Sequence, residues 1–250
     1  EQFMPRILSE LAVDGLLINL LTRVPRGMQE LIERFKIPAV WINEQGDSDC
    51  VTFDENEACR RATLYLLGLG HERILLAYYD YAHYSCRARA KGYCQAMRAA
   101  GREPNTWPAD FFQIRSARLD QNLPRTRRWA RTTLLDPNRP TAIIAATSES
   151  AEVIAAEAVR LGLELGRDLS LITFETHIVP VGGRKCTIMA LHTPGVGEAA
   201  VELLMKKIDR PSEPCRSIMY SRRLIEGETT GPVLGHTPDA ALSQEASDGV

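Results

Sequence analysis

The sequence of 250 residues lacks the long apolar runs and the short motifs that mark membrane proteins and common enzymes. No apolar run approaches the roughly 20 residues that cross a bilayer, so no membrane partner is expected. The chain has no G-x-S-x-G, no Walker phosphate loop and no H-E-x-x-H. Gly68 and Gly70 precede an apolar run instead of following one, so they make no dinucleotide fingerprint. We therefore expect no catalytic residues and no enzyme.

Metal-binding patterns are absent as well. The six cysteines form no C-x-x-C pair, and no histidine stands at metal-ligand spacing, so no metal or other cofactor is expected. The first residues, EQFMPRILSELAVDG, lack the basic start and the apolar core of a signal peptide. Reduced thiols in a cytoplasmic protein are the favoured interpretation, although a mature secreted protein could still pair its cysteines.

Neither sign of charge is in large excess, because the formal net charge is -2 and the pI is about 6.3. This balance argues against nucleic-acid binding by the chain itself. The basic stretch 125–131 (RTRRWAR) is a local exception, and a solvated helix face is the favoured interpretation. A hydrophobic content of 44% suits a soluble globular protein, and the length suits one large α/β domain or two lobes.

The chain does contain a regular alternation of helical and strand patterns, seen best over residues 62–93. A helical stripe there ends at Gly68 and Gly70, because glycine adopts the left-handed conformation that caps a helix. The apolar run 74–79 is typical of a strand covered on both faces. A polar loop then leads into a second helix over 89–99.

The same alternation continues along the chain. Further strands are predicted at 14–20, 38–43, 110–114, 141–147, 169–174, 187–191 and, as a terminal strand or hairpin, 217–225. Further helices are predicted at 4–11, 28–35, 58–70, 123–134, 151–161 and 196–208. This order indicates parallel sheets with right-handed crossovers.

Four segments of this pattern resemble the effector-binding core of the lac/galactose repressor family. They are LGLGHERI, the motif S-x-x-x-R-x-x-G-Y that begins at Ser85, RPTAIIAAT at 139–147 and DLSLITFE at 168–175. Their order and spacing agree with the family across roughly residues 12–231.

The resemblance implies a two-lobed, periplasmic-binding-protein-like α/β fold in which each lobe is a parallel sheet flanked by helices. The first lobe would hold residues 1–70 and 192–210, and the second 71–191 and 211–231. Family members carry one more strand-helix-strand and a DNA-binding headpiece before the point where this sequence begins. The first lobe is therefore expected to be incomplete, with an exposed sheet edge. The polar tail 232–250 is predicted to be disordered.

Five candidate ligand-binding residues lie near strand ends of the second lobe, where parallel α/β sheets bind ligands. The resemblance places Arg89 on the effector, and its planar guanidinium can bind two adjacent hydroxyls or a carboxylate. The alternative is a surface arginine in an R-x-R-x-K run. Ser85 stands one helical turn before Arg89, and Thr147 ends a strand. Phe174 and Glu175 form the family's aromatic-acid pair; Glu175 could accept from sugar hydroxyls, or serve as a cap or salt bridge.

Four of the remaining candidates could face the ligand from the opposite side, and the fifth is an aromatic ring. Asn19 and Asn43 end the two strands of the first lobe, and Asp54 and Glu57 follow the second strand. As polar residues in turns they are as often structural. The ring of Tyr84 could stack on a sugar, although such rings more often belong to the core.

The resemblance to the lac/galactose repressor family implies the effector-binding and dimerisation core of a bacterial sugar-responsive transcriptional regulator. A small-molecule effector, by default a sugar, would bind between the lobes and favour one lobe orientation. A homodimer would transmit that change to operator DNA through the headpiece that this chain lacks. A periplasmic sugar-binding protein of a transporter is the main alternative, and the LGLGH and DLSLITFE motifs favour the regulator. An enzyme would need a nucleophile-base pair or a cofactor loop, and the sequence shows neither.

Overall fold

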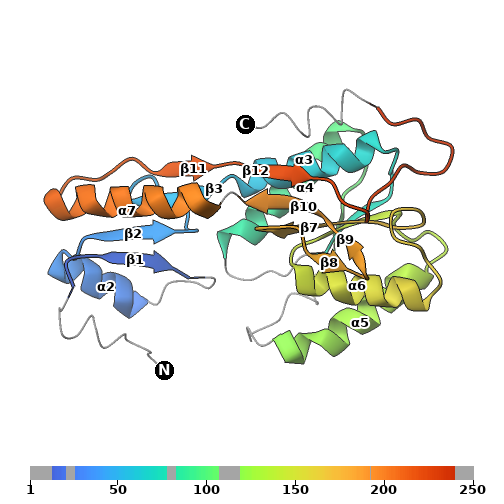
Figure 1. Cartoon of the computed structure of the whole chain (residues 1–250), viewed down its shortest axis with the longest axis horizontal. Coiled ribbons are helices and arrows are strands. Elements are labelled where there is room, and N and C mark those ends of the chain that lie inside the picture. Colours follow the sequence, from blue (N-terminus) through green and yellow to red (C-terminus); the bar gives the residue numbers. More distant parts are fainter. Residues whose placement is uncertain (1–12, 21–25, 78–82, 107–118, 192, 240–250) are drawn as a thin grey trace. The chain divides into compact units, whose positions relative to one another are not determined.

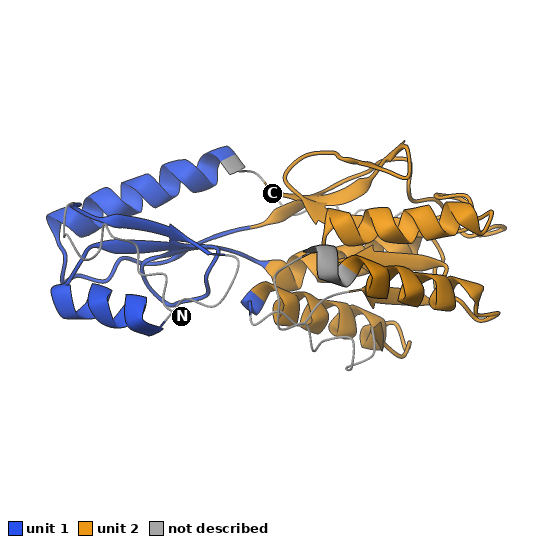
Figure 2. Ribbon diagram, turned by 90° about the horizontal axis from the view of Figure 1, so that it is seen from below, with its two compact units in different colours: residues 1–54, 82–84, 192–220 blue, residues 55–81, 85–191, 221–250 orange. Residues whose placement is uncertain are grey.

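The structure is a computed structural model of the chain, and it describes residues 13–20, 26–77, 83–106, 119–191 and 193–239. The chain divides into two compact units, shown in Figure 2. Unit 1 comprises residues 1–54, 82–84 and 192–220, and unit 2 comprises residues 55–81, 85–191 and 221–250. Each unit has its own sheet with helices packed on it, which confirms the predicted α/β class.

Unit 1 contains a four-stranded parallel sheet in the order β1-β2-β3-β11. Its strands are β1 Leu16–Asn19, β2 Ala39–Ile42, β3 Cys50–Phe53 and β11 Ile218–Tyr220, and its helices are α2 Arg26–Phe35 and α7 Thr193–Asp209. Ile32 of α2 packs against Ile18 and Ala39 of the sheet. Of these six elements, β1, β2, α2 and α7 were predicted, and β11 lies within the predicted segment 217–225. Strand β3 was missed because its short run follows a polar loop.

Unit 2 contains a six-stranded sheet in the order β12-β10-β7-β6-β4-β5, parallel except for β12. Its strands are β4 Ile74–Ala77, β5 Asn105–Thr106, β6 Ala142–Ala145, β7 Ser170–Glu175, β10 Thr187–Leu191 and β12 Arg222–Ile225. Its helices are α3 Glu55–Gly68, α4 Tyr84–Ala99, α5 Leu119–Leu135 and α6 Ser148–Arg160, and the first residue of α4, Tyr84, belongs to unit 1. Strand β8 Pro180–Val181 pairs with β9 Arg184–Lys185. Every residue of β4 and β6 is buried, as expected for strands covered on both faces.

Alternate residues of the unit 2 strands point to opposite faces and build two cores. On one face Ile143 and Leu171 pack with Ile154 of α6. On the other face Ile144 packs with Leu66 of α3, and α4 adds further apolar side chains. Figure 1 shows α5 and α6 on one side of this sheet and α3 and α4 on the other. Because β4, β6 and β7 are parallel neighbours, their carboxyl ends lie together at one edge of the sheet, between the two helix layers.

Helix α3 corrects the predicted lobe boundaries. The sequence put residues 1–70 in the first lobe, whereas unit 1 ends at Asp54 and α3 belongs to unit 2. The reason is packing, because Ala58, Ala62 and Leu66 are buried in the unit 2 core. The end of the helix was predicted correctly, since Gly70 has a φ of 84° just beyond it.

Residues 217–225 form neither a single terminal strand nor a hairpin. β11 pairs with β3 in unit 1, and β12 pairs with β10 in unit 2, so this segment adds one strand to each sheet. The predicted helix 4–11 and strand 110–114 lie outside the described residues. Disorder of the tail stays a prediction; within it the Val233 N–H donates to the Leu69 carbonyl at 3.0 Å.

Candidate functional site

The carboxyl-terminal edge of the unit 2 sheet carries five of the predicted candidates. Strands β4, β6 and β7 are parallel neighbours, so their carboxyl ends meet there. Ser85 and Arg89 lie in the first turns of α4, the helix that follows β4 along the chain. Thr147 comes directly after β6, and Phe174 and Glu175 end β7. In open α/β sheets, ligands bind outside this edge.

Arg89 is a buried residue rather than a surface arginine, since only 8% of it is exposed. Its Nε donates to Glu55 Oε2 at 2.6 Å, and its Nη1 donates to the Ala146 carbonyl at 2.9 Å. The guanidinium carbon lies 3.8 Å from the ring centroid of Phe174, a cation–π arrangement. The third nitrogen, Nη2, makes no hydrogen bond to any described residue. The group is thus fixed on three sides, and Nη2 has no hydrogen-bond partner among the described residues.

Glu55 joins Arg89 to a second buried arginine. Glu55 Oε1 accepts from Arg222 Nη2 at 2.8 Å and from Arg222 Nε at 3.1 Å. Arg222 also lies near the Phe174 ring, at 5.6 Å from its centroid. Burial alone would raise the pKa of Glu55, but Arg89 and Arg222 lower it to about 2. The four residues Glu55, Arg89, Phe174 and Arg222, called the Glu55 cluster below, therefore carry a net charge of one plus.

Sequence reasoning found Arg89 and Phe174 but missed Glu55 and Arg222. The ion pair between Glu55 and Arg222 spans 167 residues of sequence, and no local pattern encodes such a contact. The one available signal was the acid directly after Asp54, at the end of an apolar strand. Arg222 gives no signal, because charged residues are common on edge strands.

Glu175 differs from Glu55 in that its carboxylate has no ion-pair partner among the described residues. It is half-buried, and no hydrogen bond or ion pair of its carboxylate occurs within the described part of the chain. Thr147 has a structural role, since its Oγ1 accepts from the Ser150 N–H at 3.3 Å and caps α6. Ser85 is half-buried in the first turn of α4.

Two further candidates, Asn43 and Tyr84, meet within unit 1. The Asn43 carbonyl accepts from His83 Nε2 at 2.9 Å, and Asn43 Oδ1 accepts from the Tyr84 hydroxyl at 3.5 Å. The same hydroxyl lies 2.9 Å from Thr52 Oγ1. Tyr84 is only 8% exposed. The pairing favours a structural role for this tyrosine over stacking on a ligand.

The other three candidates are dispersed. Asn19 is exposed at the end of β1. Asp54 is the last residue before the first unit boundary, and its N–H donates to the Tyr220 carbonyl at 3.0 Å. Glu57 pairs with Arg60 one turn along α3 at 2.7 Å and lies in unit 2 instead of the first lobe. The structure does not gather these three with Arg89.

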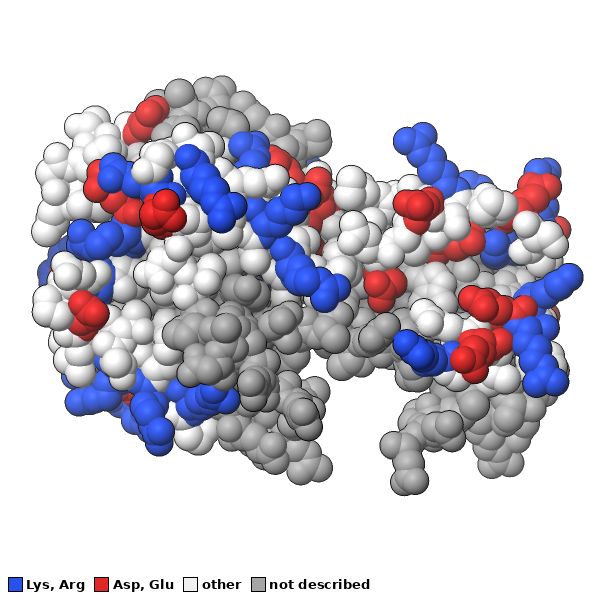
Figure 3. Space-filling model, turned by 180° about the vertical axis from the view of Figure 1, so that it is seen from behind, with Lys and Arg blue, Asp and Glu red and all other residues white. Residues whose placement is uncertain are grey.

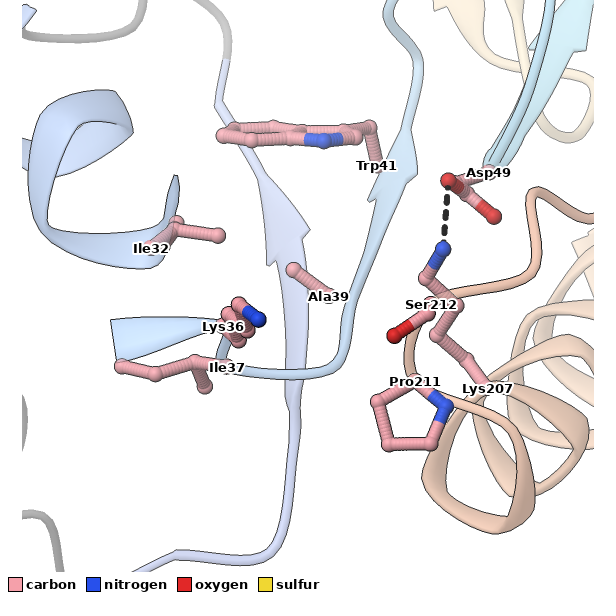
Figure 4. A pocket seen from close by; sticks show the side chains of 9 residues that line it. All are labelled: Ile32, Lys36, Ile37, Ala39, Trp41, Asp49, Lys207, Pro211 and Ser212. Carbon is pink, nitrogen blue, oxygen red and sulfur yellow. Dashed lines mark hydrogen bonds and ion pairs between the residues drawn. The ribbon is translucent and has the colours of Figure 1, made fainter. Parts of the chain in front are cut away.

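A separate hollow of about 300 Å³ lies in unit 1, beside Trp41 and the start of β2 (Figure 4). Lys207, in the last turn of α7, reaches across to Asp49 at 2.9 Å and to the Glu213 carbonyl at 3.0 Å. These contacts anchor the end of α7. The hollow lies at the amino-terminal end of β2, whereas Asn43 follows the opposite end.

The described residues contain neither a metal-binding cluster nor a membrane-spanning helix. Among them, no group of three or more His, Cys, Asp or Glu side chains is placed to hold a metal ion. None of the described helices is long and apolar enough to cross a membrane. Basic and acidic side chains both occur on the face shown in Figure 3, in keeping with the small net charge.

Comparison with known proteins identifies the class. Residues 63–230 match the family of periplasmic binding protein-like domains. The HTH-type transcriptional repressor PurR of Escherichia coli is 26% identical over 235 residues, covering 88% of this chain and 64% of that protein. A LacI family transcriptional regulator from Mycobacterium smegmatis has 26% identity and a TM-score of 0.73, covering 91% of this chain and 82% of that one. The chain belongs to the family of periplasmic binding protein-like domains.

Within this family the chain is a core of the LacI type, as its four motifs predicted. A LacI family regulator from Enterococcus faecium with bound ribose has the same fold at 21% identity and a TM-score of 0.72, covering 90% of this chain and 82% of that one. These relatives are transcriptional regulators, so the comparisons do not favour the transporter alternative. The chain spans 64% of the length of the PurR protein.

Proposed function

We propose that this chain is the effector-binding and dimerisation core of a bacterial sugar-responsive transcriptional regulator. The observation that carries the proposal is the state of Arg89, which is held by Glu55, Ala146 and Phe174 and keeps one donor nitrogen unused. A guanidinium fixed in this way is ready to donate without reorganising when a ligand arrives.

The effector we propose is a neutral sugar or related polyol. Sugar hydroxyls both accept and donate, so one ligand can accept from Arg89 Nη2 and donate to the Glu175 carboxylate. A phosphorylated ligand fits less well, because Glu175 would repel it. The fold neighbour from Enterococcus faecium carries ribose, and another neighbour is a CelR–cellobiose complex at 19% identity. Both support the sugar class.

Regulation would follow from a change in conformational populations. A ligand that binds one arrangement of the two units more tightly than another shifts the equilibrium by its difference in affinity. Operator DNA would be bound by a headpiece outside these 250 residues, in keeping with the relation to the repressor PurR. A regulator of this kind works in the cytoplasm.

A homodimer would form through the exposed face of α5 and α6. Hollows of about 620 Å³ and 580 Å³ adjoin there and share Leu123 and Val153. One end of this face is acidic, with Glu149 and Glu152, and the other end is basic. The basic end carries four arginines around one buried glutamate, namely Arg127, Arg128, Arg131, Arg160 and Glu157.

This arrangement is self-complementary under two-fold symmetry. A two-fold axis near Leu123 and Val153 would place the basic end of one copy on the acidic end of the other, as an isologous interface requires. Leu123 is 42% exposed and would be covered by the partner. The apolar centre with charged ends matches the usual anatomy of an interface.

Charge exchange tests this interface by sedimentation equilibrium. Arg131→Glu and Glu152→Arg should each weaken the dimer, since each places like charges opposite one another. The double variant Arg131→Glu/Glu152→Arg should restore it, because the pairing is then reversed in both copies. Two single variants that sediment like the wild type would contradict the assigned face.

A thermal-shift screen of the purified chain against neutral sugars tests the effector site. A ligand at 100 times its dissociation constant should stabilise the chain by about 2.7 kcal/mol. Arg89→Lys keeps the charge that balances Glu55 but loses the planar fork, so the shift should disappear. Arg87→Lys is the matched control, because Arg87 is exposed on the same helix. A shift that survives Arg89→Lys would place the ligand elsewhere.

A further inference from the structure

The Glu55 cluster lies beside the points where the chain passes between its units. Unit boundaries fall after Asp54, on either side of residues 82–84, after Leu191 and after Tyr220. Glu55 is the first residue of unit 2 after the first boundary, and Arg222 is the second residue after the last one. The cluster therefore connects the proposed ligand-binding residue Arg89 to two residues that lie just after points where the chain crosses between units.

Hydrogen bonds connect Arg222 to segments near two of these boundaries. Arg222 Nη1 donates to the Met189 carbonyl at 3.3 Å, two residues before the boundary at Leu191. The Arg222 carbonyl accepts from Arg61 Nη1 of α3 at 3.1 Å. Arg222 is thus held by both its side chain and its backbone, close in sequence to the last crossing and bonded close to the crossing after Leu191.

The division of the Glu55 carboxylate between two arginines is the central feature. Its Oε2 accepts from Arg89, and its Oε1 accepts from Arg222. Glu55 is only 1% exposed, so water does not screen either interaction. A ligand that changes the interaction of Arg89 with Glu55 therefore alters the strength of the ion pair between Glu55 and Arg222.

We propose that Glu55 is a positioning residue that orients Arg89 for its ligand and, through Arg222, couples occupancy of Arg89 to the segments where the chain crosses between units. The inference rests on the proposed effector site at Arg89. It adds a defined route by which a ligand at the edge of unit 2 acts on the crossings. By linkage, a change at the crossings alters ligand affinity to the same extent.

The coupling is tested first without ligand, by NMR of the arginine Nε–H groups in the purified chain. Arg222→Met should shift the Arg89 Nε signal in the wild-type background, because Glu55 then serves one arginine only. The same change in a Glu55→Gln background should leave that signal in place. Glu72→Gln is the matched control, since Glu72 pairs with Arg102 at an exposed site. An Arg89 Nε signal that does not shift in Arg222→Met would contradict the proposed coupling.

Ligand binding gives the second readout, with D-ribose, cellobiose and the sugars of the thermal-shift screen as probes. Glu55→Gln should weaken the binding of any stabilising sugar about tenfold to a hundredfold, because Arg89 loses its charged partner. Glu55→Asp should recover part of that loss, whereas Glu72→Gln should match the wild type. Unchanged affinity in Glu55→Gln would refute the positioning role.

The two readouts separate this inference from the proposed function. If no sugar stabilises the wild type, the proposed function fails, while the NMR result still decides whether Glu55 couples the two arginines. If Glu55→Gln alone does not fold, Glu55→Gln/Arg222→Met removes one charge of each sign and takes its place, compared with Arg222→Met as the parent.

Discussion

His71 offers a stability test whose size follows from its surroundings. It is 4% exposed, at the junction between α3 and β4. Its Nε2 lies 3.1 Å from the Gly231 carbonyl and 2.9 Å from Ser170 Oγ, and its Nδ1 lies 3.0 Å from Thr141 Oγ1. A carbonyl can only accept, so Nε2 carries the proton and Nδ1 accepts from Thr141. The imidazole is neutral and fully paired.

Protonation of this imidazole should destabilise the fold. Burial lowers the pKa of His71 from its ordinary 6.5 to about 4, although the hydrogen bond to Gly231 opposes the shift. The unfolded chain therefore takes up the proton first as the pH falls. The stabilisation is present above pH 6.5 and is lost progressively as the pH falls from 6.5 to 4. The loss should be about 2 kcal/mol at pH 5 and about 3 kcal/mol at pH 4.

Urea unfolding followed by circular dichroism at pH 7, 5 and 4 measures this loss. His71→Gln keeps a polar side chain but cannot titrate, and the other acidic groups titrate alike in both proteins. The wild type should therefore lose about 3 kcal/mol more than His71→Gln between pH 7 and pH 4. Parallel loss in the two proteins would refute the buried neutral imidazole.

Two further predictions concern the packing of α4. A Cβ added at Gly92 would lie 1.9 Å from the Asn56 carbonyl oxygen, so Gly92→Ala should cost about 1–3 kcal/mol in urea unfolding. Gly197→Ala is its control, because that helical position is open, and it should be neutral or stabilise by up to about 1 kcal/mol. The fully buried Tyr93 hydroxyl accepts from the Asn105 N–H at 2.7 Å, so Tyr93→Phe should cost about 1–3 kcal/mol, and a loss near zero would show that water replaces the hydroxyl.

The parts of the fold that local chemistry determines were predictable. Strand β4, Ile74–Ala77, lies within the predicted strand 74–79 and follows from its apolar run. The helix stop at Gly70 follows from a glycine, which has a positive φ there. The placement of α3 was not predictable, because this helix is buried on most of its surface and its sequence does not indicate which sheet it covers. The division of 217–225 into two strands was also not predictable, because it depends on pairing with β3 and β10, which are distant in sequence.

The candidate site divides in the same way. Arg89 and Phe174 were found because they belong to motifs that lie at strand ends, and the structure brings them into contact. Glu55 and Arg222 complete the cluster through contacts over 34 and 167 residues, which no local pattern reveals. Tyr84 was a candidate for stacking because ring exposure cannot be read from a sequence.

The most direct test of the account is a crystal structure of the chain with the neutral sugar that stabilises it most. The account predicts a sugar at the carboxyl-terminal edge of the unit 2 sheet, with one hydroxyl accepting from Arg89 Nη2 and another donating to the Glu175 carboxylate. A sugar bound instead in the hollow beside Trp41, with Arg89 untouched, would contradict it.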